Sequence, residues 1–287
     1  MTIAEFLYTS VLGRKPFRGL TNALIRRIVP AELDVGGATV VLNPNDPVIS
    51  GALTFGVYER PETRFFCAAC RPGMTFLDIG ANVGYYTALA IPRIGGTGRV
   101  IALEPDPENF QYLQATIRAN RAANVIAIPK AVGAAAGATV LHTSSSNRGD
   151  NRLYPNDLCD GSCEVEVCTV DDLLGNLGVE SVDLIKMDVQ GFEGHVLEGM
   201  KQTIRRSPNL TAMIEFWPFG LQSAGTSPEG FLTDLEQLNL RLYELTKKGA
   251  VAPITDKQSL IRRHPGRQYT NVVLFGGSAE PPAALPK

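Results

Sequence analysis

The sequence has no long hydrophobic run and almost no excess of one charge. Its apolar stretches are strand-sized, well short of the roughly 18 to 20 residues that a transmembrane helix needs, and polar residues interrupt the amino-terminal segment before a signal-peptide core can form. The 27 Lys and Arg residues nearly balance the 29 Asp and Glu residues, which gives a net charge of −2. We therefore expect a cytoplasmic protein without stable membrane insertion, and no dedicated binding of nucleic acid.

Cysteine and histidine are also scarce. Five cysteines in a chain without an export signal predict reduced thiols and not a disulfide framework. The motif Cys67-Ala-Ala-Cys70 and the looser pair Cys159 and Cys163 leave a zinc site open. Because the first pair has helical spacing among apolar residues, core packing explains it without a metal.

Short β-branched segments alternate with helical patterns from Thr75 onward. This alternation predicts an α/β fold whose doubly wound, mostly parallel sheet is built from βαβ units. Seven strands are expected, at residues 75–79, 99–104, 124–132, 182–189, 210–216, 240–245 and 271–275. An extra hairpin is expected at 138–142 and 164–170, and the polar stretch 144–161 within it is a candidate acceptor loop.

Three regions are expected along the chain: an N-terminal helical cap over residues 1–70, the main domain over 71–276 and a disordered tail over 277–287. The cap would contain a short hairpin around residues 43–47 and a helix near 62–70. The basic amino-terminal stretch fits a helix packed on the domain, or alternatively one that docks on an anionic membrane surface.

The strongest motif is Asp78-Ile-Gly80-Ala-Asn82-Val-Gly84, in which a strand ends in a glycine turn and a helix follows. Gly80 would let a cofactor approach the backbone, and Gly84 would let the helix pack against the strand. Glu104 ends the next strand, where a carboxylate can accept both hydroxyls of a ribose.

Two nucleotide classes share this geometry. A dinucleotide loop reads G-x-G-x-x-G, but here Asn82 replaces the second glycine, and Asp78 places negative charge where a pyrophosphate would be repelled and a sulfonium attracted. The turn therefore favours S-adenosylmethionine over NAD. A glycine turn that binds no ligand is the remaining alternative.

Several spaced blocks carry a more specific signal. They are Gly56–Glu59, Asp78–Thr87, Ala102–Pro107, Lys130–Gly133, Asn147–Asn151, Val170–Leu173 and Val182–Glu193. With these blocks the chain resembles the FkbM-type methyltransferases, a class I S-adenosylmethionine-dependent family that mostly methylates hydroxyls. The resemblance implies a class I methyltransferase (Rossmann-like) fold.

The resemblance also implies roles for individual residues. Asp78, Gly80 and Asn82 would line the methionine end of the cofactor, and Glu104 would hold its ribose. Pro105 and Val132 would flank the adenine. Glu59 would reach the amino acid moiety of the cofactor from the cap.

Two acids, Asp188 and Glu215, end later strands of the predicted sheet and should face the same crevice. Either one fits a general base that takes the proton of an acceptor hydroxyl. Alternatively they would hold Mg²⁺, with Glu193 and Asp150 as further ligands. His195 is a further candidate base, although its position one turn into a helix fits a histidine at the surface or behind the catalytic groups better.

The polar loop suggests the kind of acceptor. Arg148, Asp150 and Asn151 are candidate substrate residues because their side chains can hydrogen-bond a sugar or another polyhydroxylated molecule, and Arg148 with Arg152 could bind a carboxylate or phosphate. The predicted function is methyl transfer from S-adenosylmethionine to a hydroxyl of a small molecule, sugar or glycolipid. The alternatives are a nucleic-acid methyltransferase, disfavoured by the charge balance and the lack of an N-P-P-[YF] motif, and a cofactor-binding module without turnover.

Overall fold

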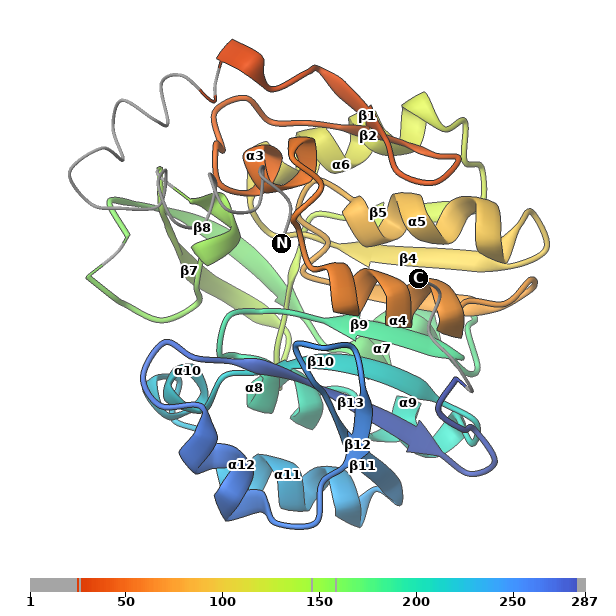
Figure 1. Cartoon of the computed structure of the whole chain (residues 1–287), viewed down its shortest axis with the longest axis vertical. Helices are drawn as coiled ribbons and strands as arrows, with labels where there is room; N and C mark the ends of the chain where they lie inside the picture. The colour runs from red at the N-terminus through yellow and green to blue at the C-terminus, as the bar shows by residue number, and fades with distance from the viewer. Residues whose placement is uncertain (1–24, 26, 146, 158, 283–287) are drawn as a thin grey trace.

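The computed structural model describes residues 25, 27–145, 147–157 and 159–282 (Figure 1). The strands are β1 (Glu32–Asp34), β2 (Thr39–Val41), β3 (Thr75–Ile79), β4 (Arg99–Leu103), β5 (Val125–Ile128), β6 (Ala131–Val132), β7 (Gly137–Thr143), β8 (Gly161–Cys168), β9 (Leu184–Met187), β10 (Thr211–Phe216), β11 (Leu240–Leu245), β12 (Val251–Pro253) and β13 (Thr270–Gly276). The α-helices are α3 (Ile49–Thr54), α4 (Arg60–Ala69), α5 (Tyr85–Ile94), α6 (Pro107–Ala119), α7 (Val170–Asn176), α8 (Glu193–Glu198), α9 (Lys201–Arg206), α10 (Pro218–Ser223), α11 (Pro228–Gln237) and α12 (Lys257–Arg263).

A central sheet of eight strands has the order β12-β11-β13-β10-β9-β3-β4-β5. β5, β4, β3, β9 and β10 are parallel, whereas β13 is inserted antiparallel between β10 and β11. The seven expected strands are all present, and the short edge strand β12 is an addition to them. The chain leaves β3 toward β4 and returns on its other side as β9, so the topological switch point lies at the carboxyl end of β3.

Helices cover both faces of the sheet because successive strand residues point to opposite sides. Phe76 and Val100 face the layer that contains α4 and α5, where Phe66 and Leu89 pack against them. On the other face, buried side chains of the same strands pack against α7, α8, α9, α11 and α12. The result is the α/β three-layer fold that the sequence predicts.

The expected extra hairpin is present as β7 and β8. These strands pair antiparallel, and β6 joins β8 to complete a separate three-stranded sheet. The single strand predicted over 124–132 is therefore wrong in its second half, since β5 stays in the central sheet and β6 leaves it. In Figure 1 the sheet of β7 and β8 projects beside the central sheet.

The N-terminal region differs from its prediction. The hairpin is formed by β1 and β2, and residues 43–47 form the turn that leads into α3. Val40 and Leu42 pack against Val83 and Ala88, so the region shares a core with α5. The boundary at residue 70 stays a prediction.

At both ends of the chain, some residues lie outside the part that the structure describes. The basic amino-terminal stretch lies outside the described residues except for Ile25 and the positions from 27 onward. Of the predicted tail, Glu280 pairs with Arg241 at 2.8 Å, while residues 283–287 lie outside the described residues. Within the part of the chain that the structure describes, every helix is too short or too polar to cross a bilayer.

Candidate functional site

A cavity of about 470 Å³ opens at the carboxyl ends of β3, β4 and β9. This is the edge at which ligands bind in open parallel sheets. The cavity brings together most of the residues that the sequence singled out: Glu59, Gly80, Asn82, Glu104, Pro105, Val132, Arg148, Asp150, Asn151, Asp188 and Glu215 all line it. Asp78, Gly84 and His195 do not.

The two glycines of the motif turn serve the fold more directly than expected. Gly80 has φ +81°, and a Cβ there would lie 2.0 Å from the carbonyl oxygen of Asp188. Gly84 has φ +87°, and its Cβ would lie 2.9 Å from Leu113 Cδ1 in α6. Gly80 thus permits close approach of β9 to the turn, and Gly84 permits packing of α5 against α6, not against the strand.

Glu104 is fixed by the backbone on both sides of its carboxylate. Asn82 N donates to Oε2 at 2.8 Å, and Asp106 N donates to Oε1 at 2.9 Å. Burial raises the pKa of Glu104 to about 8, although these hydrogen bonds lower it. The carboxyl group therefore faces the cavity in one orientation, with acceptor capacity left for a ligand hydroxyl.

Asp78 lies beneath the turn and not in the cavity wall. Its side chain is buried, Thr87 Oγ1 donates to Oδ2 at 2.6 Å, and Oδ1 has no hydrogen-bond partner within the described part of the chain. Burial raises the pKa of Asp78 to about 6. Asp78 does not line the cavity, and the cofactor contact that the resemblance implies for it stays a prediction.

Lys186 is the buried cation of the site. Its Nζ lies 3.4 Å from Asp188 Oδ2 and 5.3 Å from the centre of the Tyr86 ring. Burial lowers the pKa of Lys186, but Asp188, Glu59 and the other nearby carboxylates outweigh burial and raise it above its usual value. One ammonium group is thus surrounded by several carboxyl groups.

Glu59 is the residue that precedes α4, and it lines the cavity. Its backbone is left-handed, with φ +37°, a conformation that costs a non-glycine residue on the order of 1–3 kcal/mol. Tyr86 Oη donates to Glu59 Oε2 at 2.6 Å. Burial raises the pKa of Glu59 to about 7, so a strained residue holds a titratable carboxyl at the cavity wall.

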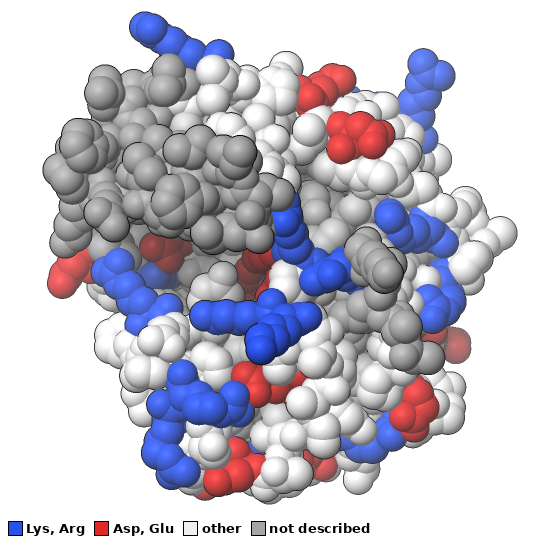
Figure 2. All heavy atoms as spheres, viewed as in Figure 1, with Lys and Arg blue, Asp and Glu red and all other residues white. Residues whose placement is uncertain are grey.

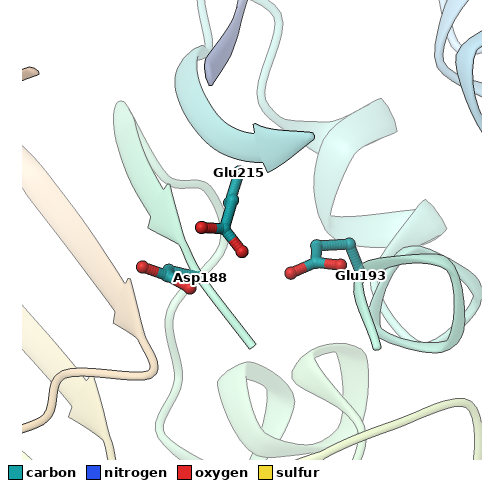
Figure 3. Close-up of side chains that lie close together, drawn as sticks. All are labelled: Asp188, Glu193 and Glu215. Carbon is teal, nitrogen blue, oxygen red and sulfur yellow. The ribbon is translucent and has the colours of Figure 1, made fainter. Parts of the chain in front are cut away.

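Three further carboxyl groups meet at the ends of β9 and β10 (Figure 3). Oxygens of Asp188, Glu193 and Glu215 all lie within 4.8 Å of one another. Gln190 Nε2 donates to Asp188 Oδ1 at 2.9 Å and to Glu215 Oε2 at 3.2 Å. An amide group therefore bridges two of the three.

Burial controls the protonation of this cluster. It raises the pKa of Glu193 to about 7 and that of Glu215 well above its usual value, and neighbouring carboxylates add to both shifts. Glu193 Oε1 accepts from the N–H groups of Val189 and Gly191, whereas Oε2 is buried and has no hydrogen-bond partner in the residues that the structure describes. Protonation relieves repulsion among buried carboxylates.

The structure separates His195 from this cluster. Its ring stacks on Phe192, and its Nε2 lies 2.8 Å from the carbonyl oxygen of Ala224. The ring is engaged with α8 and the end of α10 and does not line the cavity. The prediction of His195 as a catalytic base is therefore wrong for this arrangement.

The polar loop is anchored to α6 by the residues expected to bind an acceptor. Arg148 Nη1 and Asn151 Nδ2 donate to Asp106 Oδ2 at 2.8 and 2.6 Å. Asp106 Oδ1 accepts from the N–H groups of Glu108 and Asn109, which caps α6. Arg148 and Asn151 line the cavity, but their polar atoms already hold the loop in place.

Aromatic and basic residues that carry no motif complete the wall. Tyr58, Trp217, Arg267 and Tyr269 line the cavity, and the Arg152 guanidinium lies 4.6 Å from the centre of the Trp217 ring. Trp217 follows β10 directly, a position that marks the same sheet edge as Glu215. Arg267 and Tyr269 precede β13 without a sequence signal.

The cysteines do not form a metal site. Cys67 and Cys70 pack in the layer between α4 and the sheet, while Cys163 packs within the three-stranded sheet. All five are free thiols. Among the described residues, none belongs to a group of potential metal ligands, so the zinc alternative is wrong there.

The cavity fits S-adenosylmethionine on two observations. Glu104 presents a fixed carboxyl group at the end of the second parallel strand, where the sequence predicts a ribose contact, and the carboxyl groups around Lys186 suit a sulfonium and an ammonium group. Pro105 and Val132 supply apolar surface beside Glu104.

The comparisons with known proteins agree with this geometry. The model of the family described as methyltransferase FkbM domain matches residues 78–242. A hexuronic acid methyltransferase, AglP, from Haloferax volcanii is 26% identical over 45% of this chain and 50% of its own length. A 2-O-methyltransferase, NoeI, from Sinorhizobium fredii is 46% identical over 17% of this chain and 20% of its own length.

Among solved structures, the FkbM methyltransferase from Methylobacillus flagellatus is 16% identical. The alignment covers 90% of this chain and 59% of that chain, with a TM-score of 0.44. The chain thus matches half of the length of the first curated relative and a fifth of the second.

Proposed function

The chain belongs to the FkbM methyltransferase family, and on this basis we propose that it transfers a methyl group from S-adenosylmethionine to a hydroxyl group of a sugar or a similar polyhydroxylated molecule. The observation that carries the proposal is Glu104, whose carboxyl group is fixed by two backbone N–H groups at the cavity wall. The names of the two relatives, a hexuronic acid methyltransferase and a 2-O-methyltransferase, support a sugar hydroxyl as the acceptor.

When bound, S-adenosylmethionine supplies an already activated methyl group. The chain must then position the acceptor and take up its proton. Glu104 would accept hydrogen bonds from the ribose, and Gly80 and Asn82 would form the wall beside the methionine end. The loop anchored through Asp106 lines the same cavity and would help to exclude water from the reacting groups.

Asp188 is the proposed proton acceptor. It lines the cavity, and its Oδ atoms receive hydrogen bonds from Gln190 and Lys186. Both donors orient the carboxylate, and Lys186 stabilises its charge. Glu215 lies on the other side of Gln190 and shares the acidic field.

The same carboxylates were candidates for a Mg²⁺ site. Gln190 Nε2 occupies hydrogen-bonding positions of both Asp188 and Glu215, so a cation would compete with this amide for the same oxygens. The raised pKa values of Glu193 and Glu215 favour protonation of these carboxyl groups, which reduces the negative charge of the cluster without a cation. We therefore propose acid–base catalysis that needs no resident metal. A metal ion bound at this cluster would have Asp188, Glu193 and Glu215 as its ligands.

Incubation of the full chain with methyl-labelled S-adenosylmethionine and a panel of sugars and uronic acids tests both proposals. Labelled O-methyl products should form, and dialysis against EDTA should not reduce their yield. Loss of activity in EDTA that Mg²⁺ restores would contradict the metal-free mechanism. Label found on nucleic acid and on none of the sugars would contradict the proposed acceptor class.

A further inference from the structure

A second cavity, of about 570 Å³, adjoins the first. Val57, Glu59, Arg267 and Tyr269 line both, so the two are the inner and outer parts of one cleft. The outer part is formed by the start of α4, the turn after β11 and the segment before β13. A ligand that enters the inner cavity from this side passes through the outer one.

The outer cavity is lined by more basic than acidic side chains. Arg64, Lys247 and Arg267 line it and make no ion pair with any residue that the structure describes. Its two acidic residues are engaged, since Glu59 accepts from Tyr86 and Glu62 accepts from Asn271 Nδ2 at 3.1 Å. Figure 2 shows basic side chains gathered across the middle of the face that is also seen in Figure 1.

Two features indicate that this charge is arranged for a ligand. Arg64 Nε is buried and has no hydrogen-bond partner among the described residues, and leaving such a group unsatisfied costs about 1–3 kcal/mol or more. The amino terminus of α4, at Arg60, also opens on this cavity and adds positive potential. An anionic group would satisfy the guanidinium and neutralise the surplus charge.

We propose that the outer cavity binds a carboxylate or phosphate group of the acceptor. This inference rests on the proposed function for the identity of the ligand as an acceptor. The anion would sit outside among Arg64, Lys247 and Arg267, because these three pair with no carboxylate among the described residues, whereas Arg148 and Arg152 of the inner wall already do. The acceptor ring would then pass Tyr269, which is 44% exposed, and present its hydroxyl to Asp188.

Matched probes test the proposal without needing methyl transfer. Calorimetry on the full chain with S-adenosylhomocysteine would compare methyl glucoside, methyl glucuronide and glucose 1-phosphate. At low salt, at least one anionic probe should bind about tenfold more tightly than the neutral glucoside. The stronger anionic probe identifies which of the two anions the site prefers.

Variants assign the preference to the outer cavity. The double variant Arg64→Gln/Lys247→Gln, at two residues that line the outer cavity alone, should lose the preference for the anionic probe and keep its affinity for S-adenosylhomocysteine. Arg205→Gln, an exposed arginine of α9 outside both cavities, is the matched control and should behave as wild type.

Three results would overturn the inference: no binding of either anionic probe, equal affinity for neutral and anionic probes, or a preference that persists in the double variant. Failure to bind S-adenosylhomocysteine would instead contradict the proposed function. Because probe binding can also be measured without that compound, the two failures are distinguishable.

Discussion

Asp188 illustrates how single residues acquire their roles from neighbours. The carboxylate of Asp188 is oriented by Gln190 and paired with the buried Lys186, and these contacts fix it at the edge of the inner cavity. The ammonium group of Lys186 lies beside it. A base that is oriented in this way can accept a proton as the methyl group is transferred.

At this scale we expect Asp188→Asn to reduce kcat by roughly 10²–10⁴-fold, the usual contribution of a positioned base. Binding of S-adenosylhomocysteine should change little, since the amide preserves the shape of the side chain. Steady-state kinetics and calorimetry on the same preparations measure the two effects. Asp234→Asn, in α11 and outside the cavity, is the control, and equal kcat in Asp188→Asn and wild type would remove Asp188 from catalysis.

Residue roles were only partly predictable from the sequence. The ends of strands placed Glu104, Asp188 and Glu215 at one edge because parallel strands share a direction. Side-chain partners decided the rest: His195 turns to the carbonyl oxygen of Ala224, and Arg148 turns to Asp106. Such choices depend on residues distant in sequence, which a motif does not contain.

At the scale of elements, α6 and the polar loop are joined through one side chain. Asp106 caps α6 with Oδ1 and holds Arg148 and Asn151 with Oδ2. Glu104, two residues earlier, faces the cavity. The helix cap, the loop and the proposed ribose site therefore depend on the same turn.

We expect Asp106→Ala to destabilise the protein by more than the roughly 0.5–2 kcal/mol of a lost N-cap, because Arg148 also loses a partner. Hydrogen exchange in residues 147–151 should become faster, and denaturant unfolding gives the stability change. Asp256→Ala removes the cap of α12 alone and should leave exchange in the loop unchanged. An unaltered loop in Asp106→Ala would contradict this anchoring.

Elements with strong patterns were predictable, and weakly patterned ones were not. β3 and β11 have the bounds expected from their apolar runs. The strands β1 and β2 are each three residues long, which is too short to show a periodicity. The hairpin was therefore predicted at Asn43–Pro47, where the turn-forming residues lie. β6 leaves the central sheet because it pairs with β8, a long-range contact.

For the whole molecule, the near-zero net charge conceals a polar cleft. The inner part gathers carboxyl groups, and the outer part gathers basic side chains. Composition predicted the absence of a global field but gave no information on this separation. The charge pattern arises because strand ends, the start of α4 and the segment before β13 converge.

Buried carboxyl groups also make stability depend on pH. Burial raises the pKa of Asp78 to about 6, of Glu193 to about 7 and of Glu104 to about 8. The folded state therefore holds protons that the unfolded chain has released at the same pH, and stability falls as pH rises from the unfolded to the folded pKa values.

We expect the Tm of the ligand-free protein to decrease between about pH 5.5 and about pH 8.5. Glu193→Gln removes one of the titrating groups and should make the decrease smaller. Thermal unfolding followed by circular dichroism over this range measures both. A Tm that rises across this window in wild type would show that these carboxyls do not dominate.

The most direct test of the account is calorimetric titration of the full chain with S-adenosylhomocysteine and, separately, with NAD. We expect one site for S-adenosylhomocysteine and no heat with NAD. The affinity for S-adenosylhomocysteine should be at least about tenfold lower in Glu104→Ala. It should equal that of wild type in the control Glu180→Ala, whose side chain is exposed and does not line the cavity. Binding of NAD in place of S-adenosylhomocysteine, or equal affinity in wild type and Glu104→Ala, would contradict it.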